Sequence, residues 1–258
     1  MSESRKNFAS QGEALATRLG LNLPTGSPGI AEFAAEAGFA SIWARSTLTP
    51  EDRFFPVLAT LAALDRREVL AVHLEAALEI GINARAVQEI IIQCALYGGL
   101  PLAITGLETA AKVFEKKGLL QPQAEAIEVE QSNWTRDDLL IEGRRIMNQL
   151  HGERSGEGYA APEDPATSAL YDVAIRYGYG VIWSRPGLTW RQRMLVGVAA
   201  FTALRLTPTL TKFAQSALGQ GLTREQVVEA IMQTAPYGGF PPALTALSQI
   251  RPILFPDS

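Results

Sequence analysis

Histidine is the side chain that most readily moves a proton near neutral pH, and the chain has only two histidines. His73 lies in the apolar segment VLAVHLEAAL, eight residues before Gly81. Among apolar neighbours, a histidine is either a general acid or base or a core residue whose ring bonds to the backbone. Both interpretations stay open at this point, and the apolar segment by itself favours the second.

A stripe of polar residues follows His73 along the chain. Glu89, Gln93 and Tyr97 are spaced by four residues, so they share one face of a helix whose other face is apolar. Such a stripe meets solvent or lines a polar cavity. The stripe ends at Gly98-Gly99, followed closely by a proline. This break ends one helix and starts another, and a helix N-terminus behind glycines is also a candidate anion-binding site.

The polar stripe belongs to a long internal repeat. Residues 38–107 align without a gap on residues 178–247, with 26 identities in 70 positions. Self-similarity at a single large offset indicates a duplicated domain rather than a short solenoid repeat. The repeat gives two samples of one fold. It places Phe213 opposite His73, so the imidazole is present in only one copy.

Two arginines of the repeat also require partners. Arg53 and Arg193 occupy equivalent positions in apolar-rich segments. A buried arginine needs a carboxylate, because an unpaired buried charge is costly. Glu89 and Glu229, which are equally repeated, are the candidates. We therefore expect one structural ion pair in each half, and we favour this role over a catalytic one.

Helical periodicity and capping residues account for all of the expected elements. Thr49 and Asn83 are predicted N-caps, and Gly81 is a predicted helix end. No segment alternates in the manner of a strand, so we predict an all-α fold. We expect a first domain over 1–118, a linker over 119–134 and a second domain over 135–258. The expected helices of the first repeat and the start of the second cover residues 8–20, 30–43, 50–64, 68–80, 84–97, 101–117 and 137–150.

Composition excludes several classes of function. The net charge of −4 argues against a nucleic-acid-binding surface. The sequence contains no run of about 18 apolar residues, so we predict no membrane span. The first residues do not resemble a signal peptide. With Cys94 as the only cysteine, the chain has no internal disulfide, no Cys-x-x-Cys pair and no thiolate zinc site, and two histidines make a metal centre improbable. We expect a cytoplasmic protein without a metal.

Three segments together resemble the carboxymuconolactone decarboxylase family: residues 73–101, 182–193 and 221–244. Their shared features are a Trp-x-Arg start, a histidine eight residues before a glycine, and a Tyr-x-Gly-x-Pro break. The resemblance covers roughly 5–118 and 135–255. It implies two tandem copies of the alkylhydroperoxidase-D-like helical domain. Single-domain members of the family form rings of six, so a tandem chain is expected to form a trimeric homo-oligomer.

The resemblance also separates two chemical branches of the superfamily. The peroxidase branch uses a Cys-x-x-Cys pair, and the corresponding residues here are Arg66 and Val69, and Leu206 and Thr209. The proton-relay glutamate of that branch falls near Phe54. Disulfide-exchange chemistry is therefore not expected. The remaining resemblance is to the decarboxylase branch, which works without a cofactor.

That branch implies a mechanism for His73. Decarboxylation of a small carboxylated lactone or β-keto acid, or its isomerisation, requires a cation for the carboxylate and an acid for the carbon. The hypothesis is that His73 donates the proton, with Tyr97 and Glu89 nearby and Arg45 or Arg53 as the cation. The protein would be a carboxy-lyase rather than a peroxidase.

The loss of the histidine from one copy supports a different hypothesis. The chain would then be a non-catalytic member of the same fold that binds a small molecule or serves as a scaffold. An enclosed pocket lined by His73 and an arginine would favour the enzyme, whereas an apolar core closed around His73 would favour the scaffold. If the first copy is catalytic, the second is expected to be a degenerate copy kept for assembly.

Overall fold

The computed structural model describes residues 4–156 and 165–256, and within these ranges every regular element is a helix. The first repeat contains α1 (Arg5–Arg18), α2 (Ile30–Phe33) with its continuation η1 (Ala34–Trp43), α3 (Pro50–Ala63), α4 (Arg67–Glu79), α5 (Ala84–Gly98) and α6 (Leu100–Lys116). The linker contains α7 (Ala126–Gln131). The second repeat contains α8 (Arg136–His151) with η2 (Gly152–Gly156), α9 (Ser168–Val173) with η4 (Ala174–Trp183), α10 (Trp190–Ala203), α11 (Thr207–Gly219), α12 (Arg224–Gly238) and α13 (Phe240–Leu254). The prediction of an all-α fold with two equivalent sets of helices is confirmed.

The predicted helix ends depend on local hydrogen bonds. The Thr49 side chain accepts from the Asp52 N–H at 3.1 Å, and Asn83 accepts from the Ala86 N–H at 2.8 Å. Each bond satisfies an amide that the first turn of a helix leaves without a partner. Gly99 separates α5 from α6 with a φ of 96°, in the region that glycine adopts without strain. The predicted caps and the predicted helix break are confirmed.

A π-helix is the local feature that periodicity did not predict. Residues Ala34–Trp43 form η1, and Ala174–Trp183 form the equivalent η4. The π-helical turn is wider than an α-helical turn and is associated with functional sites. Both segments end on a tryptophan, so the wider turns determine where Trp43 and Trp183 lie.

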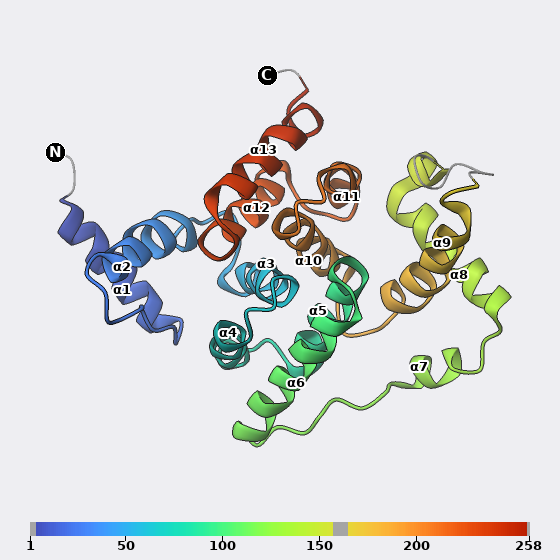
Figure 1. Ribbon diagram of the computed structural model, residues 1–258, viewed down its shortest axis with the longest axis horizontal. Coiled ribbons are helices and arrows are strands. Elements are labelled where there is room, and N and C mark those ends of the chain that lie inside the picture. The colour runs from blue at the N-terminus through green and yellow to red at the C-terminus, as the bar shows by residue number, and fades with distance from the viewer. Residues whose placement is uncertain (1–3, 157–164, 257–258) are drawn as a thin grey trace.

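The two repeats interlock around one hydrophobic core. Helix α3 packs against α10 and α12, and α5 packs against α10. Buried residues of both repeats form a single cluster. Figure 1 shows these four helices in the centre of the molecule. The exact domain boundaries at 118 and 135 remain a prediction.

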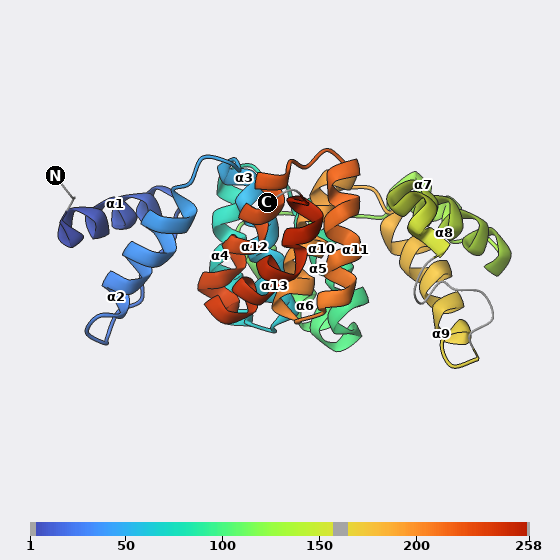
Figure 2. The same ribbon diagram turned by 90° about the horizontal axis from the view of Figure 1, so that it is seen from above.

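The N-terminal hairpin of each repeat lies at one end of the molecule. Figure 2 shows the α1–α2 hairpin and the α8–α9 hairpin on opposite sides of the body formed by α3–α6 and α10–α13. Helix η1 packs against α12, and η4 packs against α5. Each hairpin therefore contacts a helix of the other repeat. These contacts between the repeats determine which side chains meet at the candidate sites.

No helix of the described residues is long and apolar enough to cross a membrane.

Candidate functional site

His73 lies on α4 with 7% of its surface exposed, and both of its ring nitrogens are engaged. Nδ1 is 2.8 Å from the Val69 carbonyl oxygen, and Nε2 is 3.0 Å from the Tyr237 hydroxyl. A carbonyl oxygen can only accept a hydrogen bond, so Nδ1 carries the proton. In the neutral ring Nε2 is then the acceptor, and Tyr237 donates its hydroxyl proton to His73.

The Tyr237 hydroxyl has a second partner. The Trp43 indole N–H donates to it at 2.9 Å. The Tyr237 and His73 rings meet edge to face, with centroids 5.0 Å apart. Trp43 lies at the end of η1, so the hairpin of the first repeat and α12 of the second complete one hydrogen-bonded chain. We call Trp43, His73 and Tyr237, together with Arg45, Arg53 and Glu229, which meet on the same helix α12, the His73 site.

The charged residues of the His73 site also come from both repeats. Arg53 donates to Gln233 Oε1 at 2.9 Å and to Glu229 Oε2 at 3.1 Å. Arg45 donates through Nε to the same carboxylate and holds Arg53 through its backbone carbonyl. Arg53 and Glu229 are both buried. The ion pairs of the repeat are therefore structural contacts between the halves, and the expectation of one pair inside each half is wrong.

The equivalent residues form a second cluster, which we call the Phe213 site. Arg193 contacts Glu89 Oε2 at 3.2 Å and Gln93 Oε1 at 3.2 Å. Arg185 donates to Glu89 Oε1 at 3.0 Å. Tyr97 accepts from the Gln93 amide at 3.1 Å. Phe213 takes the position of His73 in this cluster.

Two expected neighbours of His73 therefore lie elsewhere. Tyr97 and Glu89 belong to the Phe213 site, and the expectation that they lie beside His73 is wrong. The physical reason is that the hairpin and the central helices of each repeat pack against helices of the other repeat. As a result, α12 rather than α5 contacts His73. The corresponding residues at His73 are Tyr237 and Glu229. Of the predicted residues, Arg45 and Arg53 contact α12, the helix that also carries Tyr237, through Glu229 and Gln233.

The Gly98-Gly99 break is also placed away from His73. It follows Tyr97 at the end of α5. The Leu102 side chain covers Gly98 so closely that a Cβ there would lie 2.3 Å from Leu102 Cδ2. The close contact at Gly98 and the positive φ of Gly99 explain why glycine is required at each of these positions. Anion binding at this break stays a prediction.

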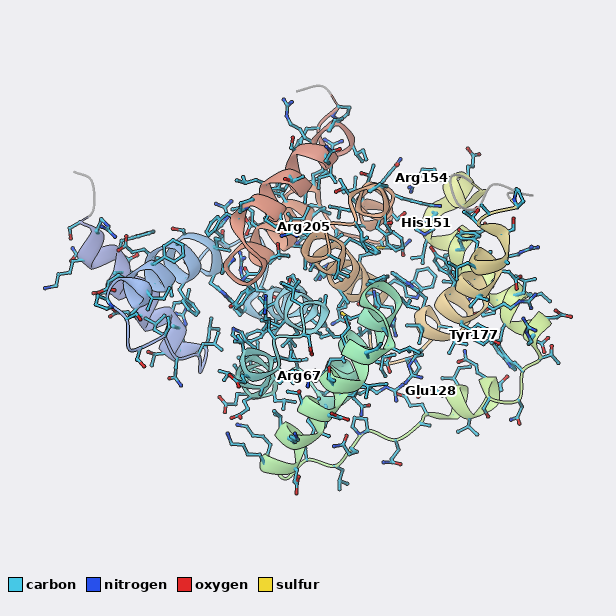
Figure 3. The ribbon with its side chains drawn as sticks, in the orientation of Figure 1. Arg67, Glu128, His151, Arg154, Tyr177 and Arg205 are labelled. Carbon is cyan, nitrogen blue, oxygen red and sulfur yellow. The ribbon has the colours of Figure 1, made fainter. Side chains whose placement is uncertain are left out.

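His151 is the residue that the sequence did not bring forward. Its Nδ1 is 2.7 Å from Ser216 Oγ, its Nε2 is 2.9 Å from the Tyr179 hydroxyl, and its ring centroid is 4.9 Å from that of Phe213. Figure 3 shows His151 between α8 and α11. An imidazole thus lies beside the phenylalanine that replaces His73.

A sequence signal for this cluster did exist. Within the repeat, Ser216 stands opposite Ala76 and Tyr179 stands opposite Phe39. Two hydroxyls thus replace two apolar residues in the same copy. Together with His151 at the end of a predicted helix, these changes would have indicated a new polar cluster.

Burial sets the protonation state of both histidines. It lowers the pKa of His73 to about 4, although the bond to Val69 opposes the shift. It lowers the pKa of His151 to about 3, with help from the positive charges of Lys212 and Arg154. Burial also raises the pKa of the Tyr237 phenol. At neutral pH, the His73 site therefore contains a neutral imidazole and a protonated phenol.

His73 does not line either of two surface cavities of the described residues. One, of about 180 Å³, is lined by residues of α10, α11, α13 and the turn between α10 and α11, including Phe201, Arg205 and Thr245. The other is open and lies along α6 near Glu108 and Leu120. Among the described residues, no group of three or more His, Cys, Asp or Glu side chains is arranged to hold a metal ion.

Comparison with known proteins gives two named relatives. The 4-carboxymuconolactone decarboxylase of Acinetobacter baylyi is 31% identical over 87 residues, which cover 34% of this chain and 65% of that protein. The nitrosuccinic acid decarboxylase npaB of Metarhizium robertsii is 25% identical over 109 residues, which cover 42% of this chain and 76% of that protein. The chain thus matches slightly less than two thirds of the length of the first relative. Both relatives are named as decarboxylases.

A family model matches the chain twice, once in each repeat. The matched residues are 28–112 and 168–251, which together make up more than half of the chain. The model describes the carboxymuconolactone decarboxylase family. The chain therefore belongs to the carboxymuconolactone decarboxylase family, as a member with two tandem copies of the family's domain and no Cys-x-x-Cys pair.

Proposed function

We propose that the protein is a cofactor-independent decarboxylase of a small carboxylated lactone or β-keto acid, and that the reaction takes place at the His73 site. The observation that carries this proposal is the hydrogen bond between His73 Nε2 and the Tyr237 hydroxyl, 3.0 Å long. It joins the lone pair of a neutral imidazole to the hydroxyl proton of a phenol. In the Phe213 site a phenylalanine replaces this imidazole, and the neighbouring His151 bonds to Tyr179 and Ser216.

The pair changes the role first assigned to His73. The resting imidazole has no proton on Nε2, because Nδ1 donates to Val69. The proton available to a reacting carbon is the one on Tyr237. Tyr237 is then the direct donor, because burial lowers the pKa of His73 to about 4 and raises the pKa of Tyr237, so the proton stays on the phenol. His73 positions the hydroxyl by accepting its hydrogen bond.

Arg45 supplies the charge that a carboxylated substrate requires. Its side chain is 47% exposed, while its Nε bonds to the buried Glu229. Among the described residues, Glu229 is the only acidic side chain paired with Arg45. Arg53 is fully buried and is committed to Glu229, Gln233 and a backbone carbonyl. Arg45 therefore binds the substrate carboxylate, and Arg53 positions Glu229.

The proposed reaction balances with one proton. The bond between the carboxyl carbon and its neighbour breaks, CO₂ leaves, and the electron pair stays on the substrate as an enolate. A proton from the His73–Tyr237 pair then forms the new C–H bond and leaves with the product, and solvent supplies a new proton to the pair. Stabilising the enolate oxygen is the main electrostatic task of such a site.

The test is a screen for CO₂ release with His73→Gln as the matched variant. Carboxylated γ-lactones and β-keto acids are offered to the wild-type protein. We expect turnover of at least one compound and its loss in His73→Gln, with an unchanged far-ultraviolet circular dichroism spectrum. Equal turnover by the variant would remove His73 from the mechanism.

The burial of His73 favours a second candidate function. A ring that is 7% exposed and bonded at both nitrogens is also what a structural histidine requires. In that case the protein binds a small molecule or serves as a scaffold without turnover. Absence of CO₂ release from the whole panel, together with a lower unfolding midpoint in His73→Gln, would support this candidate.

Self-association is part of the proposal. Exposed apolar residues recur at equivalent positions of both repeats, which singly scattered surface residues would not do. Phe33 and Phe240 bring two of them together across the repeats, with ring centroids 6.3 Å apart. We expect three chains to bury these faces in one ring of six domain copies. The equivalent exposed pairs are Ile30 and Leu170, Phe33 and Val173, Leu100 and Phe240, and Ile104 and Leu244.

A further inference from the structure

The linker helix α7 delivers a carboxylate into the Phe213 site. Glu128 Oε1 lies 2.7 Å from Arg185 Nη2, and Glu128 Oε2 lies 2.6 Å from Arg85 Nη2. The same Oε2 accepts from the Glu125 N–H at 2.9 Å, which fixes the side chain on its helix. The Glu128 side chain is 9% exposed. Figure 3 shows Glu128 on the side of α7 that faces the body of the molecule.

Two of the residues that hold α7 have no equivalent at the His73 site. The Gln131 amide donates to Ser184 Oγ at 3.1 Å, and Arg85 Nη1 donates to the Gln123 carbonyl at 3.2 Å. In the other copy of the repeat, alanine stands opposite Ser184 and glutamate stands opposite Arg85. The surface that binds the α7 segment is therefore present at one of the two sites, and it contains residues of both repeats.

Arg185 and Arg45 are equivalent residues in two different states. Each donates through Nε to the buried glutamate of the other repeat, Glu89 or Glu229. At Arg185, a terminal nitrogen also holds Glu128, and the side chain is 21% exposed. At Arg45, no described residue takes the place of Glu128. The same guanidinium position is thus filled by a carboxylate in one site and open in the other.

We infer that Glu128 is an internal ligand, whose carboxylate occupies at Arg185 and Arg85 the position that a substrate carboxylate takes at Arg45. The statement about Arg45 rests on the proposed function. The inferred carboxylate-binding site at Arg185 and Arg85 does not depend on the proposed function. Its ligands are small mono- or dicarboxylates, which α7 keeps out by binding first.

Charge and burial explain why Glu128 stays in place. Glu128 and Glu89 together face three guanidinium groups, those of Arg85, Arg185 and Arg193. Removing Glu128 leaves three cations against one carboxylate. A largely buried cation without a partner is costly, so a free carboxylate gains from taking the vacant position. The linker also makes the competition intramolecular, which favours Glu128 over a dissolved ligand.

The experiment counts carboxylate sites by equilibrium dialysis with radiolabelled succinate on the full chain. We expect the Glu128→Ala variant to bind one more succinate per chain than the wild-type protein. Adding Arg185→Met should remove this extra site. Because alanine also removes the Glu125 contact, Glu128→Gln is the second variant. Without succinate, its amide oxygen can still accept that bond. Because the amide is uncharged, Arg185 and Arg85 hold it less strongly, so succinate should displace it and this variant should also gain the site.

Glu130→Ala is the matched control, since it removes a carboxylate from the same helix at an exposed position. It should bind as the wild-type protein does. An unchanged count in both Glu128 variants would overturn the inference, and so would an extra site that survives Arg185→Met. Arg45→Met tests the proposed function separately. If the wild-type protein has no site that Arg45→Met abolishes, the role of Arg45 fails while the inference about Glu128 is still decided by its own variants.

Discussion

Arg53 and Glu229 are 176 residues apart in the chain, and their side chains form a buried ion pair of 3.1 Å. Its counterpart joins Arg193 to Glu89, 104 residues apart, at 3.2 Å. Both pairs cross between the repeats. The His73 site consequently depends on the second repeat for its glutamate, its glutamine and its tyrosine. A second repeat kept only for assembly does not agree with this arrangement.

The first prediction concerns the crossed ion pair. Glu229→Gln should destabilise the protein by about 3–5 kcal/mol, because it leaves the Arg53 guanidinium buried without a counter-charge. Urea denaturation measures the change. Glu142→Gln is the control, since its pair with Arg145 lies at the surface and contributes no more than about 1 kcal/mol. Equal effects of the two variants would contradict a buried pair.

The second prediction concerns cooperativity. Because one core and two crossed ion pairs join the repeats, they should unfold together. Unfolding followed by circular dichroism and by tryptophan fluorescence should give coincident curves. Two separated transitions would show that each repeat folds independently of the other.

The third prediction concerns pH. Burial lowers the pKa of His73 from 6.5 to about 4, so between these values the unfolded chain binds a proton that the folded chain does not. Stability contributed by the neutral ring is complete above pH 6.5, is lost as the pH falls, and levels off below about 4. The slope in this range is up to about 1.4 kcal/mol per pH unit for one proton.

His73→Gln is the variant that removes the pH-dependent contribution of His73 to the free energy of unfolding. Its urea midpoint should fall less steeply than that of the wild-type protein between pH 6.5 and 4. His151, whose pKa burial also lowers, contributes to stability with the same sign in both proteins. Parallel pH curves for the two proteins would indicate that His73 titrates at its ordinary pKa.

The fourth prediction concerns the exposed apolar faces. The double variant Ile104→Glu and Leu244→Glu places a charge at equivalent positions of both repeats. It should convert the proposed trimer to single chains, as measured by sedimentation velocity. Leu120→Glu is the control, because Leu120 is 90% exposed on the linker and has no counterpart in the repeat. A wild-type protein that sediments as a monomer would reject the trimer.

The sequence predicted the helices because their ends depend on neighbouring residues. Thr49, Asn83 and Gly99 determine their local geometry through contacts of one to four residues. The duplication was equally accessible, since it requires only a comparison of the chain with itself. Both predictions are independent of how distant helices pack.

Which of two equivalent residues meets a given partner depends on packing, so it could not be predicted from the sequence. Glu89 and Glu229 are equivalent by repeat, and nothing in either segment tells which one faces Arg53. The choice is made by α12, which lies beside η1 and α3 of the other repeat. His151 was missed for a related reason, because its partners Tyr179 and Ser216 lie 28 and 65 residues away. The π-helical turns leave no periodic signal that differs from an α-helix over ten residues.

The central claim is that the reaction takes place in a site built from His73 of one repeat and Tyr237 of the other. The most direct measurement compares CO₂ release by Tyr237→Phe and Tyr97→Phe, with the substrate that the screen identifies. The two tyrosines are equivalent by repeat, so each variant removes one hydroxyl from the same kind of position. We predict that Tyr237→Phe loses turnover by at least about 100-fold, as expected for a lost acid–base group, while Tyr97→Phe keeps it. Loss of turnover in Tyr97→Phe with full activity in Tyr237→Phe would contradict the account.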